Sequence, residues 1–170
     1  KINEVIKNNK NKFIRAYCGD LFELLQFLRG STNLLMDFYD EDKEKILFYL
    51  IDSITNYILE TIDIWKRFEI DEIWFMDDWG TNDKMFIHPS KWKKFFEPFY
   101  KKIINKIHDC GKYAEMHSDG YIIDIIPDLI KLGLDVINPQ HNVMAHIIPL
   151  TLTPNLACVR TDIDCRQYLP

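Results

Sequence analysis

Glycine and cysteine are scarce in this sequence, and neither occurs in a pattern that marks a common type of site. The six glycines form no G-x-G-x-x-G or P-loop motif after a strand, so a nucleotide-binding domain is not indicated. The four cysteines, Cys18, Cys110, Cys158 and Cys165, are widely spaced, with no C-x-x-C pair. This spacing suits reduced thiols better than a disulfide framework, so we expect a cytoplasmic protein.

Long hydrophobic runs and an excess of basic residues are also missing. No apolar stretch approaches the roughly 20 residues that span a bilayer, and no signal-peptide pattern is seen. The net charge is −5, and the lysines from Lys91 to Lys106 recur as the solvated face of one helix. We therefore expect no membrane partner, no nucleic-acid partner and, with 47% hydrophobic residues, a packed core.

Short β-rich runs alternate with longer segments whose apolar residues recur every three or four positions. The runs predict strands at residues 13–18, 73–76, 113–117, 134–138 and 157–161. The longer segments predict a helix over 46–65 with its start marked by Asp40, one from Pro89 to Gly111 bent at Pro98, and one over 121–132 ending at Gly133. Shorter helices are expected after Asp20 and Ser31, and residues 141–154 are left unassigned.

This alternation predicts an α/β fold in which parallel strands are joined by right-handed crossovers. The strands read as apolar nearly throughout, which is expected when both faces of a sheet are covered. An open doubly wound sheet and a (β/α)8 TIM barrel both fit, and the missing nucleotide motifs favour the barrel. Because a barrel takes about 250 residues, we expect residues 1–170 to be part of a single barrel domain, with about five strands and with N- and C-terminal parts missing.

Polar residues follow each predicted strand, and in a parallel barrel these strand ends converge on one mouth. After the second strand come Asp77, Asp78, Trp79 and Thr81. Two adjacent carboxylates at a strand end can bind a cation, accept a substrate N–H or hold a proton. The alternative is that one of them caps the next helix or loop while the other is solvated.

His117 and Asp119 follow the third strand and form an H-x-D pair that could bind one metal ion. The alternative is a histidine bonded to a backbone carbonyl, with Asp119 as the N-cap of a helix that starts near Tyr121. Asn138 and Gln140, after the fourth strand, could orient a polar substrate. Asp162 and Cys165, after the fifth, are weaker candidates. The aromatic residues Trp92, Phe95 and Phe96 are predicted to be core, because they sit at helical spacing.

The strings DDWGTNDKMFIHPSKWKKFFEPFYKKII and AEMHSDGYIIDIIPDLIKLGLDVINPQ resemble the uroporphyrinogen decarboxylase family. The upstream LRGSTNLLMDFYDED and the downstream RTDIDCRQYLP are also similar to it, so the resemblance covers nearly the whole chain. The resemblance implies a (β/α) barrel, in agreement with the periodicity. Its function divides between two branches.

One branch contains the decarboxylases of haem biosynthesis, which need no metal or cofactor and bind their substrate through an aspartate and arginines. The other contains methyltransferases that move a methyl group from methylcobamide, a corrinoid, to a thiol. In that branch a zinc ion, bound by an H-x-C motif and a later cysteine, makes the thiol a thiolate. This chain is more similar to the second branch, but has His117 and Asp119 where those enzymes have H-x-C.

Charge supports the same choice independently of the resemblance. A substrate with many carboxylates would be repelled by Asp77, Asp78, Asp119 and Asp162, and Arg160 is the only arginine expected at the barrel mouth. A metal ion or a cationic intermediate would instead be attracted. We therefore expect methyl transfer from methylcobamide to a thiol acceptor, with zinc as a possible metal.

The expected catalytic residues are Asp77, Asp78 and His117, and the expected metal ligands are His117 and Asp119. Substrate binding is assigned to Trp79, Thr81, Asn138, Gln140 and Asp162. The expected partners are a small-molecule substrate and a corrinoid protein. The alternatives are a cofactor-free uroporphyrinogen decarboxylase, with Asp77 or Asp78 binding the pyrroles, and a non-catalytic corrinoid-binding relative.

Overall fold

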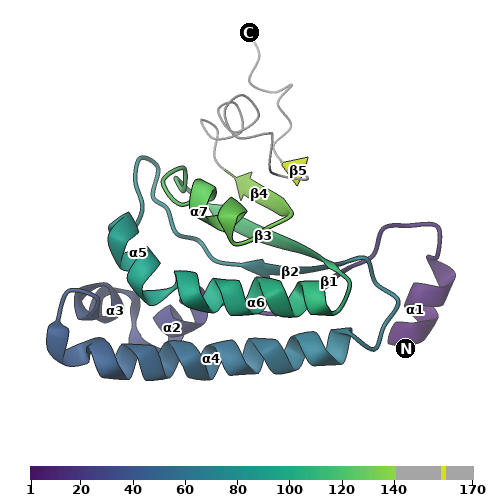
Figure 1. The fold of residues 1–170 in the computed structure, drawn as a ribbon, viewed down its shortest axis with the longest axis horizontal. Coiled ribbons are helices and arrows are strands. Elements are labelled where there is room, and N and C mark those ends of the chain that lie inside the picture. Colours follow the sequence, from purple (N-terminus) through teal and green to yellow (C-terminus); the bar gives the residue numbers. More distant parts are fainter. Residues whose placement is uncertain (141–157, 160–170) are drawn as a thin grey trace, which may run out of the picture.

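The computed structural model describes residues 1–140 and the backbone of residues 158–159 (Figure 1). Helices and strands alternate along this part of the chain as the sequence predicts. In chain order the elements are α1 (Ile2–Asn8), β1 (Arg15–Tyr17), α2 (Phe22–Arg29), α3 (Ser31–Asp37), the 3-10 helix η1 (Glu41–Lys43), α4 (Glu44–Trp65), β2 (Glu72–Met76), α5 (Pro89–Phe95), α6 (Glu97–Asp109), β3 (Tyr113–Asp119), α7 (Ile126–Lys131), β4 (Val136–Gln140) and β5 (Cys158–Val159).

The strands form one parallel sheet whose spatial order, β1-β2-β3-β4-β5, is the order of the sequence. The predicted α/β class with parallel strands is therefore confirmed. Each strand lies within about two residues of its predicted position, and β5 is the described part of the strand expected at 157–161. The unassigned segment 141–154 lies outside the described residues.

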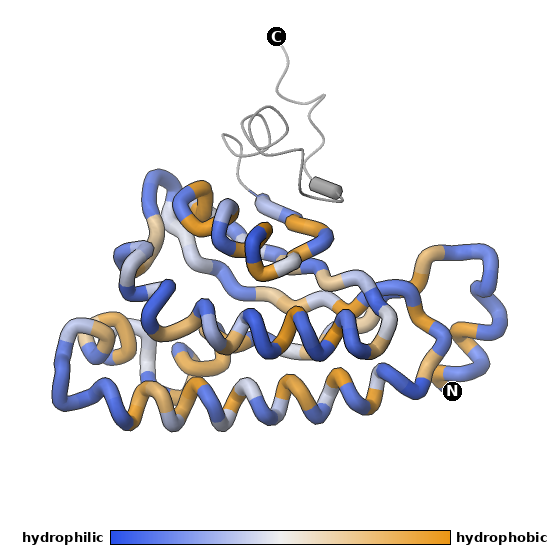
Figure 2. Tube along the Cα trace, viewed as in Figure 1, coloured by the Kyte–Doolittle hydropathy of each residue, from blue (hydrophilic) through white to orange (hydrophobic). Residues whose placement is uncertain are grey.

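One face of the sheet is covered by helices. Figure 1 shows α4 and α6 side by side along this face, and α6 packs against β3. The sheet residues that point toward them, such as Ile73, Phe75 and Met116, are fully buried. The ring of Phe75 stacks on that of Tyr100 from α6, with centroids 5.7 Å apart. The apolar positions that recur along α4 and α6 (Figure 2) supply the helix side of this core.

The opposite face of the sheet is polar, which corrects the expectation of strands that are apolar on both faces. Because neighbouring residues of a strand point to opposite faces, Arg15, Glu72 and Glu115 point away from the helices. The Arg15 guanidinium lies 2.6 Å from a carboxylate oxygen of each glutamate and 5.0 Å from the centre of the Trp74 ring. The sequence did not indicate that these two glutamates are buried, because the residues beside them in the strands are mostly apolar.

Two predicted helices differ from the structure. The helix expected from Pro89 to Gly111 is interrupted rather than bent: α5 ends at Phe95, and α6 starts at Glu97, with Pro98 in its first turn. Proline cannot donate to the preceding turn, so it starts a second helix instead of continuing the first. The helix expected from Tyr121 starts only at Ile126, because the Tyr121 amide donates to the Thr81 carbonyl in a neighbouring loop.

The remaining expectations for the helices are confirmed. Asp40 caps η1 directly before α4, and α2 and α3 follow Asp20 and Gly30. Gly133 has a positive φ after α7. The aromatic residues Trp92, Phe95 and Phe96 are buried, while the lysines of α5 and α6 lie on the outer surface. Helix α1 was not predicted, and none of the described helices is long and apolar enough to cross a membrane.

Candidate metal centre

The carboxyl ends of β2, β3 and β4 bring several predicted site residues together. The register pairs Met76 with His117, His117 with Asn138, and Asp119 with Gln140. Residues paired in this way point to the same face, so His117, Asp119, Asn138 and Gln140 share the polar face of the sheet. The sequence does not show this proximity directly, because His117 and Asn138 are 21 residues apart.

His117 lies at the centre of the group, and its two ring nitrogens face different partners. Its Nδ1 atom is hydrogen-bonded to Oδ1 of Asn138. Its Nε2 atom lies 3.4 Å from Oδ1 of Asp119. One ligand atom each from Asp78, His117 and Asp119 lie within 4.8 Å of one another. These three side chains are the only such group of His, Cys, Asp and Glu in the described part of the chain.

Asp78 is held in place by the loop that follows β3. Its Oδ1 accepts the backbone amide of Asp119 at 2.7 Å, so the two candidate ligands are fixed relative to each other. Asp119 does not cap a helix, because α7 begins seven residues later.

The loops after β2 and β3 touch backbone to backbone, and two glycines permit this contact. A Cβ atom on Gly80 would lie 2.2 Å from the Tyr121 amide nitrogen, and one on Gly120 would lie 2.1 Å from the Gly80 carbonyl oxygen. Thr81 belongs to this contact: its carbonyl accepts the Tyr121 amide, and its hydroxyl bonds Asp83 and the Lys84 carbonyl. Thr81 therefore shapes the loop, and its hydroxyl is already engaged.

Two further carboxylates face the same group, and the sequence analysis assigned no role to either. Asp20 and Glu23 follow β1, and the charge of Asp78 acts on both. Glu23 is in the first turn of α2, where an acidic residue is ordinarily explained by the helix dipole. The signal that could have found it is its place in the first turn of the helix after a parallel strand, at the same sheet edge as Asp78.

Burial, together with the charges of neighbouring carboxylates, raises the pKa values of Asp20, Glu23 and Asp119. Burial, the charges of Asp78 and Asp20 and a hydrogen bond with Asp78 together raise the pKa of Glu23 to about 7, although the charge of His117 lowers it. Burial and the charge of Asp78 also raise the pKa of Asp119, again against His117. Burial raises the pKa of Asp20, although its hydrogen bond from Tyr17 lowers it. The site thus has a negative potential that favours a cation.

Asp77 lies behind the group, on the helix-covered face, and is fully buried. Its carboxylate accepts the amides of Leu21, Phe22 and Glu23 at the start of α2, and the Tyr100 hydroxyl at 2.6 Å. Burial raises its pKa to about 8, against the opposing hydrogen bonds from Tyr100 and the backbone. In this position Asp77 connects β2 to α2 and α6, which matches the alternative that one aspartate caps a helix.

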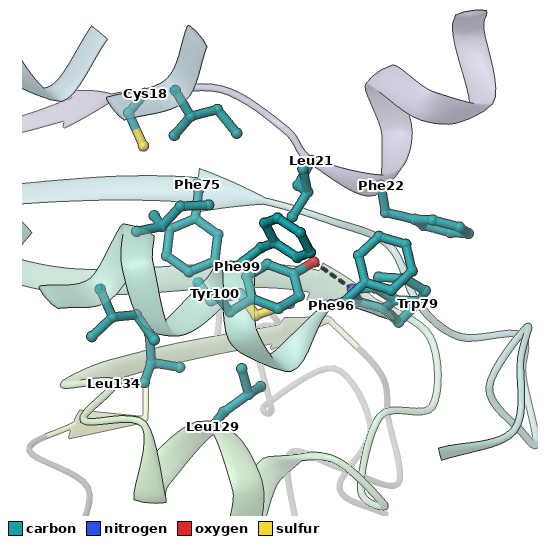
Figure 3. Packing of buried hydrophobic residues seen from close by; sticks show 14 of the residues in the cluster. Cys18, Leu21, Phe22, Phe75, Trp79, Phe96, Phe99, Tyr100, Leu129 and Leu134 are labelled. Atoms are coloured by element: carbon teal, nitrogen blue, oxygen red, sulfur yellow. Dashed lines mark hydrogen bonds between the residues drawn. The ribbon is translucent and has the colours of Figure 1, made fainter. Parts of the chain in front are cut away.

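Trp79 is also fully buried and lies apart from the group. Its ring stacks on Phe22 with centroids 3.8 Å apart, and its indole N–H donates to the Tyr100 hydroxyl at 2.8 Å, drawn as a dashed line in Figure 3. The structure therefore places Asp77 and Trp79 in the core and Asp78 at the surface of the same loop. Asp162, the remaining predicted residue, lies outside the described residues, as do Arg160 and Cys165.

The donor set fits a divalent metal ion. It consists of one imidazole nitrogen and two carboxylate oxygens, which bind zinc but also suit harder ions such as manganese. The described cysteines do not join it: Cys18 is buried on the helix-facing side, where burial raises its thiol pKa, and Cys110 ends α6. Among the described residues, the donors thus fit zinc through nitrogen and oxygen rather than through sulfur.

Neither the protein-family models nor the curated proteins compared with this chain contain a match to it. What the site can bind is therefore inferred from its own side chains. A histidine and two aspartates at the carboxyl edge of a parallel sheet can bind a metal ion, and the added charges of Asp20 and Glu23 increase its attraction.

Proposed function

We propose that this chain is part of a (β/α)8 barrel enzyme that binds a divalent metal ion through Asp78, His117 and Asp119. The reaction we propose is transfer of a methyl group from methylcobamide to a thiol. The observation that carries the proposal is the approach of the three ligand atoms to within 4.8 Å at the carboxyl ends of β2 and β3. Active sites of parallel barrels lie at this end of the strands.

The sheet supports a barrel over an open doubly wound sheet. Doubly wound sheets reverse their strand order and carry helices on both faces. Here the order β1-β2-β3-β4-β5 never reverses, and α4 and α6 lie on one face. The polar side chains of Arg15, Glu72 and Glu115 then belong to the inside of the barrel.

Zinc is the ion we propose first. Such an ion, when bound, makes a coordinated thiol a thiolate at neutral pH. The protein supplies the imidazole and carboxylates that bind the ion, and the acidic residues Asp20 and Glu23 exclude anionic competitors. Gln140 is in register with Asp119, and we propose that it helps to bind the thiol substrate.

Methylcobamide as the donor rests on the resemblance of the DDWGT and HSDG strings to the uroporphyrinogen decarboxylase family, one branch of which contains corrinoid-dependent methyltransferases. We propose that a corrinoid protein presents it and that the reaction takes place in the cytoplasm, in keeping with the widely spaced cysteines. Decarboxylation of a porphyrinogen is less well supported, because Arg15 is held by Glu72 and Glu115 and the site itself is acidic.

The metal site can be tested by titrating the metal-free chain with zinc and with manganese in a calorimeter. Asp78→Asn, His117→Gln and Asp119→Asn should each lose most of the affinity, because each removes one of three ligands. Asp124→Asn, which removes an exposed carboxylate in the loop after β3, should bind like the wild type. Equal binding by all four variants and the wild type would refute the site.

Activity distinguishes the three functions. The metal-loaded chain should demethylate methylcobalamin in the presence of a panel of thiols, and His117→Gln should abolish this. Turnover of uroporphyrinogen by metal-free protein would instead establish the decarboxylase. Tight corrinoid binding without methyl transfer would establish the non-catalytic relative.

A further inference from the structure

Asn138 contacts the candidate metal ligand His117 directly. The residue lies on β4 beside His117 on β3, and only 3% of its surface is exposed. Its Oδ1 atom is 2.5 Å from Nδ1 of His117. The sequence predicted a residue that orients substrate, and this contact places Asn138 against a candidate metal ligand.

The hydrogen bond determines which nitrogen of His117 carries the proton. An amide oxygen can only accept, so Nδ1 must be the donor. In a neutral imidazole the other nitrogen, Nε2, then holds a lone pair. That is the nitrogen which faces Asp119, at 3.4 Å.

We propose that Asn138 is a positioning residue, which holds His117 in the Nδ1–H tautomer and so directs the Nε2 lone pair toward Asp78 and Asp119. The inference rests on the proposed metal site for its purpose, but the hydrogen bond itself exists without a metal ion. Partners of this kind orient ligating histidines, and losing one typically weakens metal binding about 10- to 100-fold.

The choice of an amide at this position follows from the surrounding charge. Carboxylates often accept the second N–H of a ligating histidine. Here Asp20, Glu23, Asp78 and Asp119 already face the site, and a further buried carboxylate would add to their repulsion. Asparagine provides the same acceptor geometry without the charge.

The tautomer can be measured by ¹⁵N-correlated NMR of the metal-free chain, labelled at histidine and assigned with His117→Gln. We expect the wild type to carry the proton of His117 on Nδ1. Asn138→Asp, which keeps the acceptor oxygen, should retain this tautomer, and Asn138→Leu, which has similar volume but no acceptor, should lose it. A wild-type His117 protonated on Nε2 would overturn the inference.

Zinc affinity gives the second measurement. Asn138→Leu should bind zinc about 10- to 100-fold more weakly than the wild type, and Asn138→Asp should bind at least as tightly. The matched control is Asn82→Leu, at an exposed asparagine in the loop after β2, which should leave the affinity unchanged. Equal affinities for wild type and Asn138→Leu would overturn the positioning role.

The two measurements separate this inference from the proposed function. A wild-type chain that binds no zinc would refute the metal site, and the tautomer of His117 would still decide what Asn138 does. If Asn138→Leu fails to fold, the wild-type tautomer and the Asn138→Asp variant decide the same question.

Discussion

At the scale of single residues, Gly80 and Gly120 explain how the loops that carry the DDWGT and HSDG strings can touch in the fold. Each glycine lies where a side chain would collide with the backbone of the other loop. Their contact brings the Asp119 amide onto Asp78 at 2.7 Å and so fixes two of the three candidate ligands. The glycines thus determine the geometry of the site without touching an ion.

Gly120→Ala should be strongly destabilising. The residue has φ +75°, which costs a non-glycine residue about 1–2 kcal/mol. Its Cβ would also lie 2.1 Å from the Gly80 carbonyl oxygen, and such overpacking adds about 1–3 kcal/mol. Urea unfolding measures the sum, and zinc titration should show weaker binding because the two loops must separate.

Gly111→Ala is the matched control for this prediction. Gly111 has nearly the same conformation, with φ +70°, but nothing lies within 4 Å of the position of its Cβ. Gly111→Ala should therefore lower the free energy of unfolding only by the cost of the positive φ, and it should bind zinc like the wild type. Equal destabilisation by the two substitutions would mean that the loops do not touch as described.

At the scale of elements, Asp128 connects α7 to α5. Its carboxylate lies 2.9 Å from the Lys93 ammonium of α5 and 3.3 Å from Lys131 of its own helix. Burial raises the pKa of Asp128, but the hydrogen bonds and charges of the two lysines outweigh it, and the net effect is a lowered pKa. This contact helps to hold α7, which begins later than its apolar pattern predicts.

The lowered pKa predicts how Asp128→Asn changes stability with pH. A carboxyl whose pKa is lower in the folded state stabilises the fold above its unfolded pKa, about 3.9, and loses this contribution as the pH falls. Asp128→Asn should therefore be less stable than the wild type at pH 7, with the difference shrinking below about pH 4. Urea unfolding at several pH values measures it.

The exposed Asp124, four residues earlier, gives the comparison. Asp124→Asn, a substitution at an exposed position, should leave the free energy of unfolding at pH 7 within about 0.5 kcal/mol of the wild type. A difference for Asp128→Asn that stays constant down to pH 3 would indicate that the carboxylate contributes by packing rather than by its charge.

At the scale of the whole molecule, Arg15 connects three strands across the face that carries the site. It starts β1 and reaches the buried carboxylates of Glu72 on β2 and Glu115 on β3. Its guanidinium also lies over the Trp74 ring. Arg15 therefore helps to order the polar face of the described strands.

Arg15→Met should cost about 3–5 kcal/mol in the free energy of unfolding, because it removes the positive charge that lies against two buried carboxylates. Chemical denaturation at pH 7 measures this. Arg67→Met, at an exposed arginine, should be nearly neutral. A small effect of Arg15→Met would mean that water reaches Glu72 and Glu115.

The sequence by itself determined most of the helices and strands and the edge of the sheet at which the polar residues gather. Apolar periodicity predicted α4 and the four strands β1 to β4, since burial of one helix face or strand leaves a local pattern. The positions after the strands predicted that Asp78, His117 and Asp119 would share one edge, because the carboxyl ends of parallel strands meet there.

Only the tertiary structure decided what each polar residue does at that edge. Asp77 and Asp78 are adjacent in sequence, but they point to opposite sides, so one caps α2 in the core and the other faces His117. Asn138 and Glu23 became neighbours of the site through sheet register and through the packing of α2. Such contacts join residues that are far apart in the chain, so a local sequence pattern cannot indicate them.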